Sequence, residues 1–153
     1  KCKNCPFETM CIAHGQNQID KFPVKNKKIK QRTRYFEYLI LINETQTIIK
    51  KRTEKDIWQN LFDFPLLEFT IPKSEDEIIE ELHLILGNSF NVASVTDPIK
   101  HLLSHQKLWV RFWKLEVANL SIQNDSNIII SLSEFGVYAF PKVVDNYLAN
   151  CEF

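Results

Sequence analysis

The alternation of apolar and polar residues predicts a sheet that begins near residue 33. Residues 34–42 read RYFEYLILI, a run of β-prone side chains, and residues 47–51 form a second such run. Asn43 and Glu44 separate the two runs, and residues of these types favour turns. The pattern therefore predicts a β-hairpin and places a domain boundary at about residue 33.

Helical periodicity replaces this alternation between residues 74 and 86. Ser74 is a favourable cap, and the acidic residues 75–77 follow it in the first turn, where the helix dipole favours negative charge. Gly87 and Asn88 end the pattern. The apolar face of this predicted helix consists of Ile78, Ile79, Leu82, Ile85 and Leu86.

More strands and a last helix complete the predicted domain. The strands cover residues 90–95, 100–104, 107–117 and 128–131. Pro141 opens a helix over residues 142–151, because proline is favoured in the first turn of a helix. A hairpin, a helix, further strands and a terminal helix predict an α+β domain built in layers.

The segment from Ile99 to Trp113 (IKHLLSHQKLWVRFW) joins two apolar runs through a polar island, residues 104–106. This pattern predicts two extended segments that meet at a turn, where a hydroxyl, an imidazole and an amide are presented together. In the second run, Trp109 and Arg111 fall on the same strand face as Trp113. Such a face is either a binding surface or the side of a sheet that a helix covers, and we favour the second interpretation.

Composition and charge set the general class of the protein. The chain has 153 residues, enough for one domain and a tail, and 44% of them are apolar. Residues 1–34 hold nine Lys or Arg against two acids, a net charge of +7, and the remainder holds ten against seventeen, a net charge of −7. A basic arm beside an acidic body is typical of proteins that bind polyanions, although a solvated linker has the same composition. The candidate phosphate contacts are Lys25, Lys27, Lys28, Lys30, Arg32 and Arg34.

Three cysteines open the chain in the spacing C-x2-C-x5-C, at Cys2, Cys5 and Cys11. Thiolates this close in sequence can converge on one metal or cluster, and the spacing is too tight for ordinary disulfides. Because Cys151 lies at the far end of the chain, we expect the fourth ligand to precede Lys1 in a longer protein. The alternative is a set of reduced cysteines on a short helix.

Three motifs in order resemble the C-terminal part of the MutY family of adenine DNA glycosylases. C-x2-C-x5-C is similar to the end of that family's iron–sulfur loop, WQNLFDFP (58–65) to its W-x-x-L segment, and LLSHQKL (102–108) to its Ser-His loop. The resemblance implies a Nudix-like mixed sheet packed with helices over residues 33–153, and an extended connector over residues 1–32. It implies a 4Fe-4S cluster held by Cys2, Cys5 and Cys11 in the full-length protein, and none in this fragment.

The resemblance also implies a function, which is recognition of 8-oxoguanine opposite adenine in double-stranded DNA. Leu103, Ser104 and His105 would form the lesion-binding loop, with Ser104 at the oxidised edge, Leu103 as a wedge and His105 at a phosphate or as a brace. The family usually has Phe where this chain has Leu103, and Gly where it has Asn60. The implied partners are lesion-containing DNA and the N-terminal glycosylase domain of the same protein, which would be cytoplasmic, monomeric and without a membrane contact.

Two other functions are weighed against this one. A Nudix hydrolase needs the signature G-x5-E-x7-R-E-U-x-E-E-x-G-U, where U is a bulky aliphatic residue. A register that uses Glu68, Glu77, Glu80 and Glu81 misplaces the glycines, and a register on Phe64-Pro65 loses the acids. We therefore expect no metal-dependent hydrolysis. Nor do we expect base excision by the fragment itself, because nothing in it provides a base-flipping pocket with a catalytic carboxylate. A protein-interaction domain of a repair protein is the other alternative.

Overall fold

A computed structural model describes residues 2–22, 24, 31–120 and 127–151 of the chain. The chain divides into two compact units, residues 1–30 and residues 31–153, and each is described by itself. The first unit contains short helical turns: η1 (Cys2–Asn4), η2 (Glu8–Met10), α1 (Ile12–Gly15) and η3 (Ile19–Lys21). The sequence analysis predicted only a connector after Cys11, because this part of the chain has little apolar periodicity.

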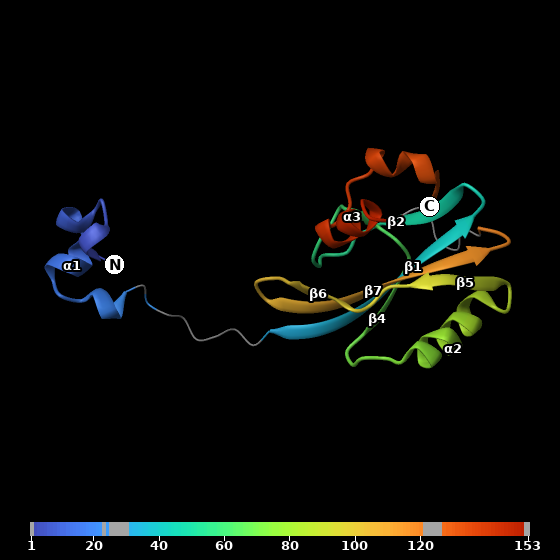
Figure 1. The fold of residues 1–153 in the computed structure, drawn as a ribbon, viewed down its shortest axis with the longest axis horizontal. Coiled ribbons are helices and arrows are strands. Elements are labelled where there is room, and N and C mark those ends of the chain that lie inside the picture. Colours follow the sequence, from blue (N-terminus) through green and yellow to red (C-terminus); the bar gives the residue numbers. More distant parts are fainter. Residues whose placement is uncertain (1, 23, 25–30, 121–126, 152–153) are drawn as a thin grey trace. The chain divides into compact units, whose positions relative to one another are not determined.

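A sheet forms the centre of the second unit (Figure 1). Its central path has the order β3-β2-β1-β7-β5, while β4 pairs with β1, β6 with β7 and β8 with β2. In the described residues its strands are β1 (Arg32–Asn43), β2 (Gln46–Lys51), β3 (Phe62–Asp63), β4 (Leu66–Phe69), β5 (Phe90–Val95), β6 (Ile99–Leu102), β7 (Gln106–Val117) and β8 (Asn127–Ser131).

The two longest strands, β1 and β7, lie side by side in parallel at the middle of this sheet. Their register runs from Arg32 opposite Gln106 to Ile42 opposite Glu116. β1 and β2 pair antiparallel, which confirms the predicted hairpin. Because both parallel and antiparallel pairs are present, the sheet is mixed, and the predicted fold class is confirmed.

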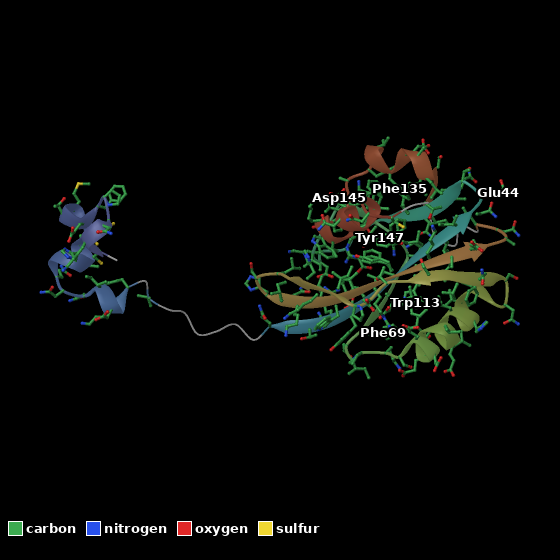
Figure 2. The ribbon with its side chains drawn as sticks, in the orientation of Figure 1. Glu44, Phe69, Trp113, Phe135, Asp145 and Tyr147 are labelled. Atoms are coloured by element: carbon green, nitrogen blue, oxygen red, sulfur yellow. The ribbon has the colours of Figure 1, made fainter. Side chains whose placement is uncertain are left out.

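Helices cover the two faces of the sheet, as Figure 1 shows for α2 (Glu75–Leu86) and α3 (Lys142–Leu148). On one face α2 packs Ile78 and Leu82 against Trp113 and other apolar side chains of β1 and β7. On the other face lie α3 and η4 (Leu132–Val137). In Figure 2 Tyr147 lies between α3 and the sheet, where its ring stacks on Phe112 with centroids 4.1 Å apart.

This packing decides between the two interpretations of the tryptophan-bearing face of β7. Trp113 is fully buried under α2, and its indole Nε1 donates to Glu37 Oε2 at 2.7 Å. Arg111 is also buried and pairs with the same Glu37 carboxylate. The face is therefore covered by a helix at these positions, as predicted.

The ends of most elements agree with the sequence pattern, with a few differences. Ser74 and Glu77 form the predicted cap of α2 as a reciprocal capping box, and Gly87 ends the helix with φ of 69°. β6 ends at Leu102, two residues before the end of the predicted strand, and Ser104 lies in the turn that was predicted for the polar island. α3 ends at Leu148, three residues earlier than predicted. No helix in the described part of the chain is long and apolar enough to cross a membrane.

Candidate nucleic-acid interface

The Ser-His motif forms a tight turn between β6 and β7. The backbone N–H of Leu103 donates to the carbonyl of Gln106 at 2.9 Å, which closes the turn. Ser104 and His105 are exposed, whereas Leu103 is half-buried and packs against the apolar cluster on the α3 side. The turn is also fixed to β1, because Arg32 N–H donates to the carbonyl of His105 at 3.2 Å. A hydroxyl and an imidazole therefore stand at a rigid, solvent-facing corner of the sheet.

The WQNLFDFP motif supplies a second segment with an unusual backbone. Trp58 and Asn60 both have positive φ, 60° and 69°. Asn60 N–H donates to the carbonyl of Arg52 at 2.7 Å, and Leu61 N–H to the carbonyl of Trp58 at 3.1 Å. Asparagine tolerates this left-handed conformation better than most residues, and glycine adopts it freely. The backbone thus gives a physical reason for glycine at this position in the resembled family.

The two motifs meet across a groove of about 290 Å³, which we call the Trp58 groove. Trp58 makes an edge-to-face contact with Phe36 at 6.3 Å and a tilted contact with the His101 ring at 5.8 Å. The residues that line the groove are Ile57, Trp58, Leu103, Ser104, His105 and Gln106. All three residues that the sequence analysis assigned to lesion binding therefore border one groove, with an aromatic wall opposite them.

Arg34 does not have the position that the sequence analysis expected. It was assigned to the DNA backbone, but its side chain is only 4% exposed and it pairs with Glu68 at 2.5 Å and Asp56 at 2.7 Å. Hydrogen bonds from the guanidinium hold the pKa of Asp56 below its usual value. Arg34 is thus a buried structural cation, because strand β1 points its side chain towards acids that are distant in sequence.

The other assigned basic residues fall into two groups. Arg32 is 62% exposed, and its Nη2 lies 3.7 Å from Glu68 Oε1, so it can reach solvent beside the Ser-His turn. The remaining candidates lie outside the described residues: Lys25, Lys27, Lys28 and Lys30.

A second charged network supports the tryptophan side of the groove. Arg52 donates from Nη1 to Asp63 Oδ2 at 2.7 Å and from Nε to the carbonyl of Ile57 at 3.1 Å. The hydroxyl of Tyr38 donates to Asp63 Oδ2 at 3.2 Å. Burial raises the pKa of Asp63, and the Arg52 cation opposes that effect. The sequence analysis quoted Asp63 within its motif but missed this role, for which the acid inside an aromatic run was the only signal.

The acidic residues that a Nudix hydrolase would need do not form a metal site in the described residues, and two of them have structural roles. Glu77 caps α2 and binds Lys73 at 2.6 Å, and Glu68 binds Arg34. Among the described residues, no three His, Cys, Asp or Glu side chains are grouped so that they could hold a metal ion. This finding covers the motif cysteines too, since Cys2, Cys5 and Cys11 are not in disulfides and do not form such a group. Their role as 4Fe-4S ligands in a longer protein stays a prediction.

Comparison with known proteins assigns the second unit to a family. The NUDIX domain family matches residues 37–150. Two curated relatives are adenine DNA glycosylases of Buchnera aphidicola, from subspecies Schizaphis graminum and Acyrthosiphon pisum. The first is 38% identical over 115 residues (72% of this chain and 30% of the relative), and the second is 30% identical over 109 residues (69% and 29%). The chain thus spans less than a third of the length of these relatives.

Solved structures show the same fold at low sequence identity. The MutT protein of methicillin-resistant Staphylococcus aureus has a TM-score of 0.58 at 14% identity, with 79% of this chain and 99% of that chain covered. The C-terminal domain of mouse MUTYH, solved in complex with human PCNA, has a TM-score of 0.52 at 13% identity, with 76% and 85% covered. From the family match and this shared fold, we conclude that the chain belongs to the NUDIX domain family.

Proposed function

We propose that this chain is the lesion-reading part of an adenine DNA glycosylase, and that it recognises 8-oxoguanine opposite adenine in double-stranded DNA. The observation that carries the proposal is the Trp58 groove, where two motifs far apart in sequence come together around an exposed hydroxyl. The names of the sequence relatives support DNA repair as the setting. Because the chain covers only 29–30% of their length, glycosylase activity belongs to the proposal for a longer protein.

The chemistry of Ser104 matches the change that oxidation makes in guanine. Oxidation converts N7 from an acceptor into an N–H donor and adds a carbonyl at C8. A serine hydroxyl both donates and accepts, so it can pair with this edge in a way that ordinary guanine does not permit. One specific contact of this kind contributes roughly 1–3 kcal/mol of discrimination between bases.

Leu103 and Trp58 provide the apolar part of the groove. Leu103 is half-buried against the apolar cluster, so it contributes a fixed wall more than a protruding wedge. Leucine also stacks on a base less well than the phenylalanine usual in the resembled family. The indole of Trp58 offers a larger aromatic surface on the opposite side of the groove. We therefore assign apolar contact with the lesion to both side chains.

Sequence-neutral affinity would come from the basic residues near the start of the domain. Arg32 extends into solvent next to the carbonyl of His105, and His105 is itself exposed on the turn. Lys25, Lys27, Lys28 and Lys30 precede them in the chain and complete the proposed backbone contact. Such contacts to phosphates position a protein on DNA without reading its sequence.

Metal-dependent hydrolysis of nucleoside diphosphate compounds is less well supported. The signature fails in every register, and the acids nearest to it are committed to a helix cap and to Arg34. The third candidate, a protein-interaction domain, is suggested by the mouse MUTYH domain, which was solved in complex with human PCNA, but the likeness to that domain shows the fold alone. Both alternatives predict equal affinity for damaged and undamaged duplexes.

The proposal is tested by direct binding of the 153-residue chain to matched DNA duplexes. Fluorescence anisotropy would compare one duplex sequence with a central 8-oxoguanine:adenine, guanine:adenine or guanine:cytosine pair, at low salt. We expect the lesion duplex to bind more tightly by roughly tenfold to a hundredfold, which corresponds to about 1.4–2.7 kcal/mol and falls within the contribution of one such contact. Equal dissociation constants for the three duplexes would contradict lesion reading by this chain.

A further inference from the structure

Arg34 does not line the Trp58 groove, but its hydrogen bonds reach both of the chain segments that do. All five N–H groups of its guanidinium donate hydrogen bonds inside the protein. The accepting side chains belong to three residues, and each of the three lies in a different segment of the chain. The acceptors are Glu68 on β4, Asp56 before the Trp58 segment and Gln106 at the end of the Ser-His turn. One buried side chain thus joins both walls of the groove to the sheet.

The first wall is held through Gln106. Arg34 Nη1 donates to Gln106 Oε1 at 2.9 Å, while the backbone carbonyl of Gln106 accepts the N–H of Leu103. The side chain and the backbone of Gln106 are therefore both fixed. Because Gln106 follows Ser104 by two residues, these bonds restrain the backbone next to Ser104.

The second wall is held through Asp56. Arg34 donates to both carboxylate oxygens of Asp56, from Nη1 at 3.1 Å and from Nη2 at 2.7 Å. Asp56 precedes Trp58 by two residues, as Gln106 follows Ser104 by two. The guanidinium carbon also lies 4.8 Å from the ring centre of Phe36, which makes an edge contact with Trp58. Arg34 is therefore connected to the Trp58 segment in two ways, through Asp56 and through the ring of Phe36.

Glu68 sets the plane of the guanidinium by accepting from Nε at 2.6 Å and Nη2 at 2.5 Å. Only a planar fork can hold this pair and still reach Asp56 and Gln106. A lysine ammonium has three donors and no fixed plane, so it cannot make the same set of bonds.

We propose that Arg34 is a positioning residue that holds Trp58 and Ser104 at a fixed separation, so that the selectivity of the groove depends on its forked hydrogen bonding. This inference rests on the proposed function for its ligand, but not for its geometry. It replaces the phosphate contact that the sequence suggested for the same residue.

Arg111 provides a matched control on the opposite face of the sheet. It is also a buried arginine paired in a forked manner with a glutamate, since its Nε and Nη2 donate to Glu37 at 2.9–3.1 Å. Its remaining bond goes to the carbonyl of Lys73, before α2, and Arg111 does not line the Trp58 groove. Arg34→Lys and Arg111→Lys thus make the same chemical change, with only the first beside the groove.

The first readout is hydrogen exchange in the 153-residue chain, which needs no DNA. In Arg34→Lys we expect faster exchange of the amides of Asn60, Leu61 and Leu103, with the amides of α2 unchanged. In Arg111→Lys we expect the groove amides to keep their protection. Unchanged exchange at the amides of Asn60, Leu61 and Leu103 in Arg34→Lys would overturn the positioning role, whatever the chain binds.

The second readout is binding of the lesion and undamaged duplexes. Arg34→Lys should reduce the preference for the lesion duplex by roughly tenfold, the ratio expected when hydrogen bonds to a charged group are removed, and should leave undamaged binding nearly unchanged. Arg111→Lys should keep the wild-type preference. Equal loss of preference in both variants would mean that general destabilisation is responsible. No preference in the wild type would remove the proposed function while the exchange result still stands.

Two milder variants cover the case in which Arg34→Lys fails to fold. Gln106→Met removes only the bond to the turn and should speed exchange at Leu103 alone. Asp56→Ala removes both Arg34 bonds to the other segment, together with the 3.5 Å contact from Arg52 Nη2, and should speed exchange at Asn60 and Leu61 but not at Leu103. If each variant loosened both walls, or neither wall, Arg34 would not be the link between them.

Discussion

The indole of Trp58 and the imidazole of His101 lie with their ring centres 5.8 Å apart, and this contact joins the segment after β2 to strand β6. Trp58 also contacts Phe36 on β1, so three parts of the chain meet at one aromatic side chain. Because its backbone has positive φ, which is rare for a bulky residue, this position is held by its surroundings and not by local preference.

Trp58→Leu should therefore weaken the binding of the lesion duplex while the domain stays folded. Removing the indole takes away the aromatic wall, and we expect the free energy of unfolding to fall by about 1–3 kcal/mol because less apolar surface is buried. The measurement is anisotropy with the lesion duplex, alongside urea unfolding. Trp109→Leu is the control, because Trp109 is half-buried next to Tyr35 and does not line the groove. If both variants weakened binding to the same extent, Trp58 would have no special part in it.

Asn60 should be replaceable by glycine but not by alanine. At φ of 69° an alanine costs roughly 1–2 kcal/mol, whereas glycine carries no such steric cost. We expect Asn60→Ala to lower the free energy of unfolding by about 1 kcal/mol and Asn60→Gly to leave it nearly unchanged. Chemical denaturation gives both values. Asn88→Ala, at an exposed position without positive φ, is the control and should have little effect.

The stability of the domain should fall in acid partly through Asp56. Its folded-state pKa lies below the ordinary value of 3.8, chiefly because Arg34 hydrogen-bonds to it. A carboxyl with a lowered pKa adds stability that is fully present above its unfolded-state pKa and is lost as pH falls through the folded-state pKa. The stability difference between wild type and Asp56→Asn should thus be constant near neutral pH and shrink below about pH 4.

Urea unfolding followed by tryptophan fluorescence measures this difference, since all three tryptophans lie in residues 31–153. Asp63→Asn is a useful comparison, because the stability difference for this variant should depend on pH in the opposite direction. Burial raises the pKa of Asp63, so the stability that this carboxyl contributes is greatest at low pH and declines as pH rises through its folded-state value. A stability difference for Asp56→Asn that did not change with pH would mean that the carboxylate charge plays no part in holding the Trp58 segment.

The basic arm should add affinity that depends on salt and not on the lesion. Replacing Lys25, Lys27, Lys28 and Lys30 with glutamine should weaken binding to all duplexes alike. For each lysine that binds a phosphate, its replacement should reduce the slope of log K against log salt by about 0.9. A titration of salt concentration with the lesion and guanine:cytosine duplexes measures the slope. An unchanged slope would make this stretch an ordinary linker.

Sequence patterns predicted the elements of this fold better than their arrangement. The β1–β2 hairpin and helix α2 depend on neighbours in the chain, so periodicity, turn residues and a cap were sufficient. The parallel pairing of β1 with β7 joins residues more than seventy positions apart, for which no local signal exists. β3 and β4 were missed because β3 has only two residues and the four residues of β4, LLEF, do not alternate between apolar and polar.

The candidate site also combines residues that local sequence predicts with contacts that only the tertiary structure reveals. Ser104 and Leu103 came from a motif, and the groove contains them both. Arg34 was misassigned because a basic residue after a basic stretch suggests an exposed contact. Only the fold places Glu68, Asp56 and Gln106 around its side chain, from three separate segments. The role of an arginine near the start of a strand can therefore be assigned only when its tertiary partners are known.

The hydroxyl of Ser104 is proposed to read the oxidised edge of guanine, and Ser104→Ala tests this role most directly. The measurement is the ratio of dissociation constants for the guanine:adenine and 8-oxoguanine:adenine duplexes, for wild type, Ser104→Ala and the control Ser89→Ala, an exposed serine before β5. Because Ser104 is exposed in a turn closed by backbone bonds, Ser104→Ala should keep the free energy of unfolding within about 0.5 kcal/mol of wild type. We expect its ratio to fall by roughly tenfold to a hundredfold while Ser89→Ala keeps the wild-type ratio. The same lesion preference in Ser104→Ala and wild type, with both proteins folded, would contradict the account.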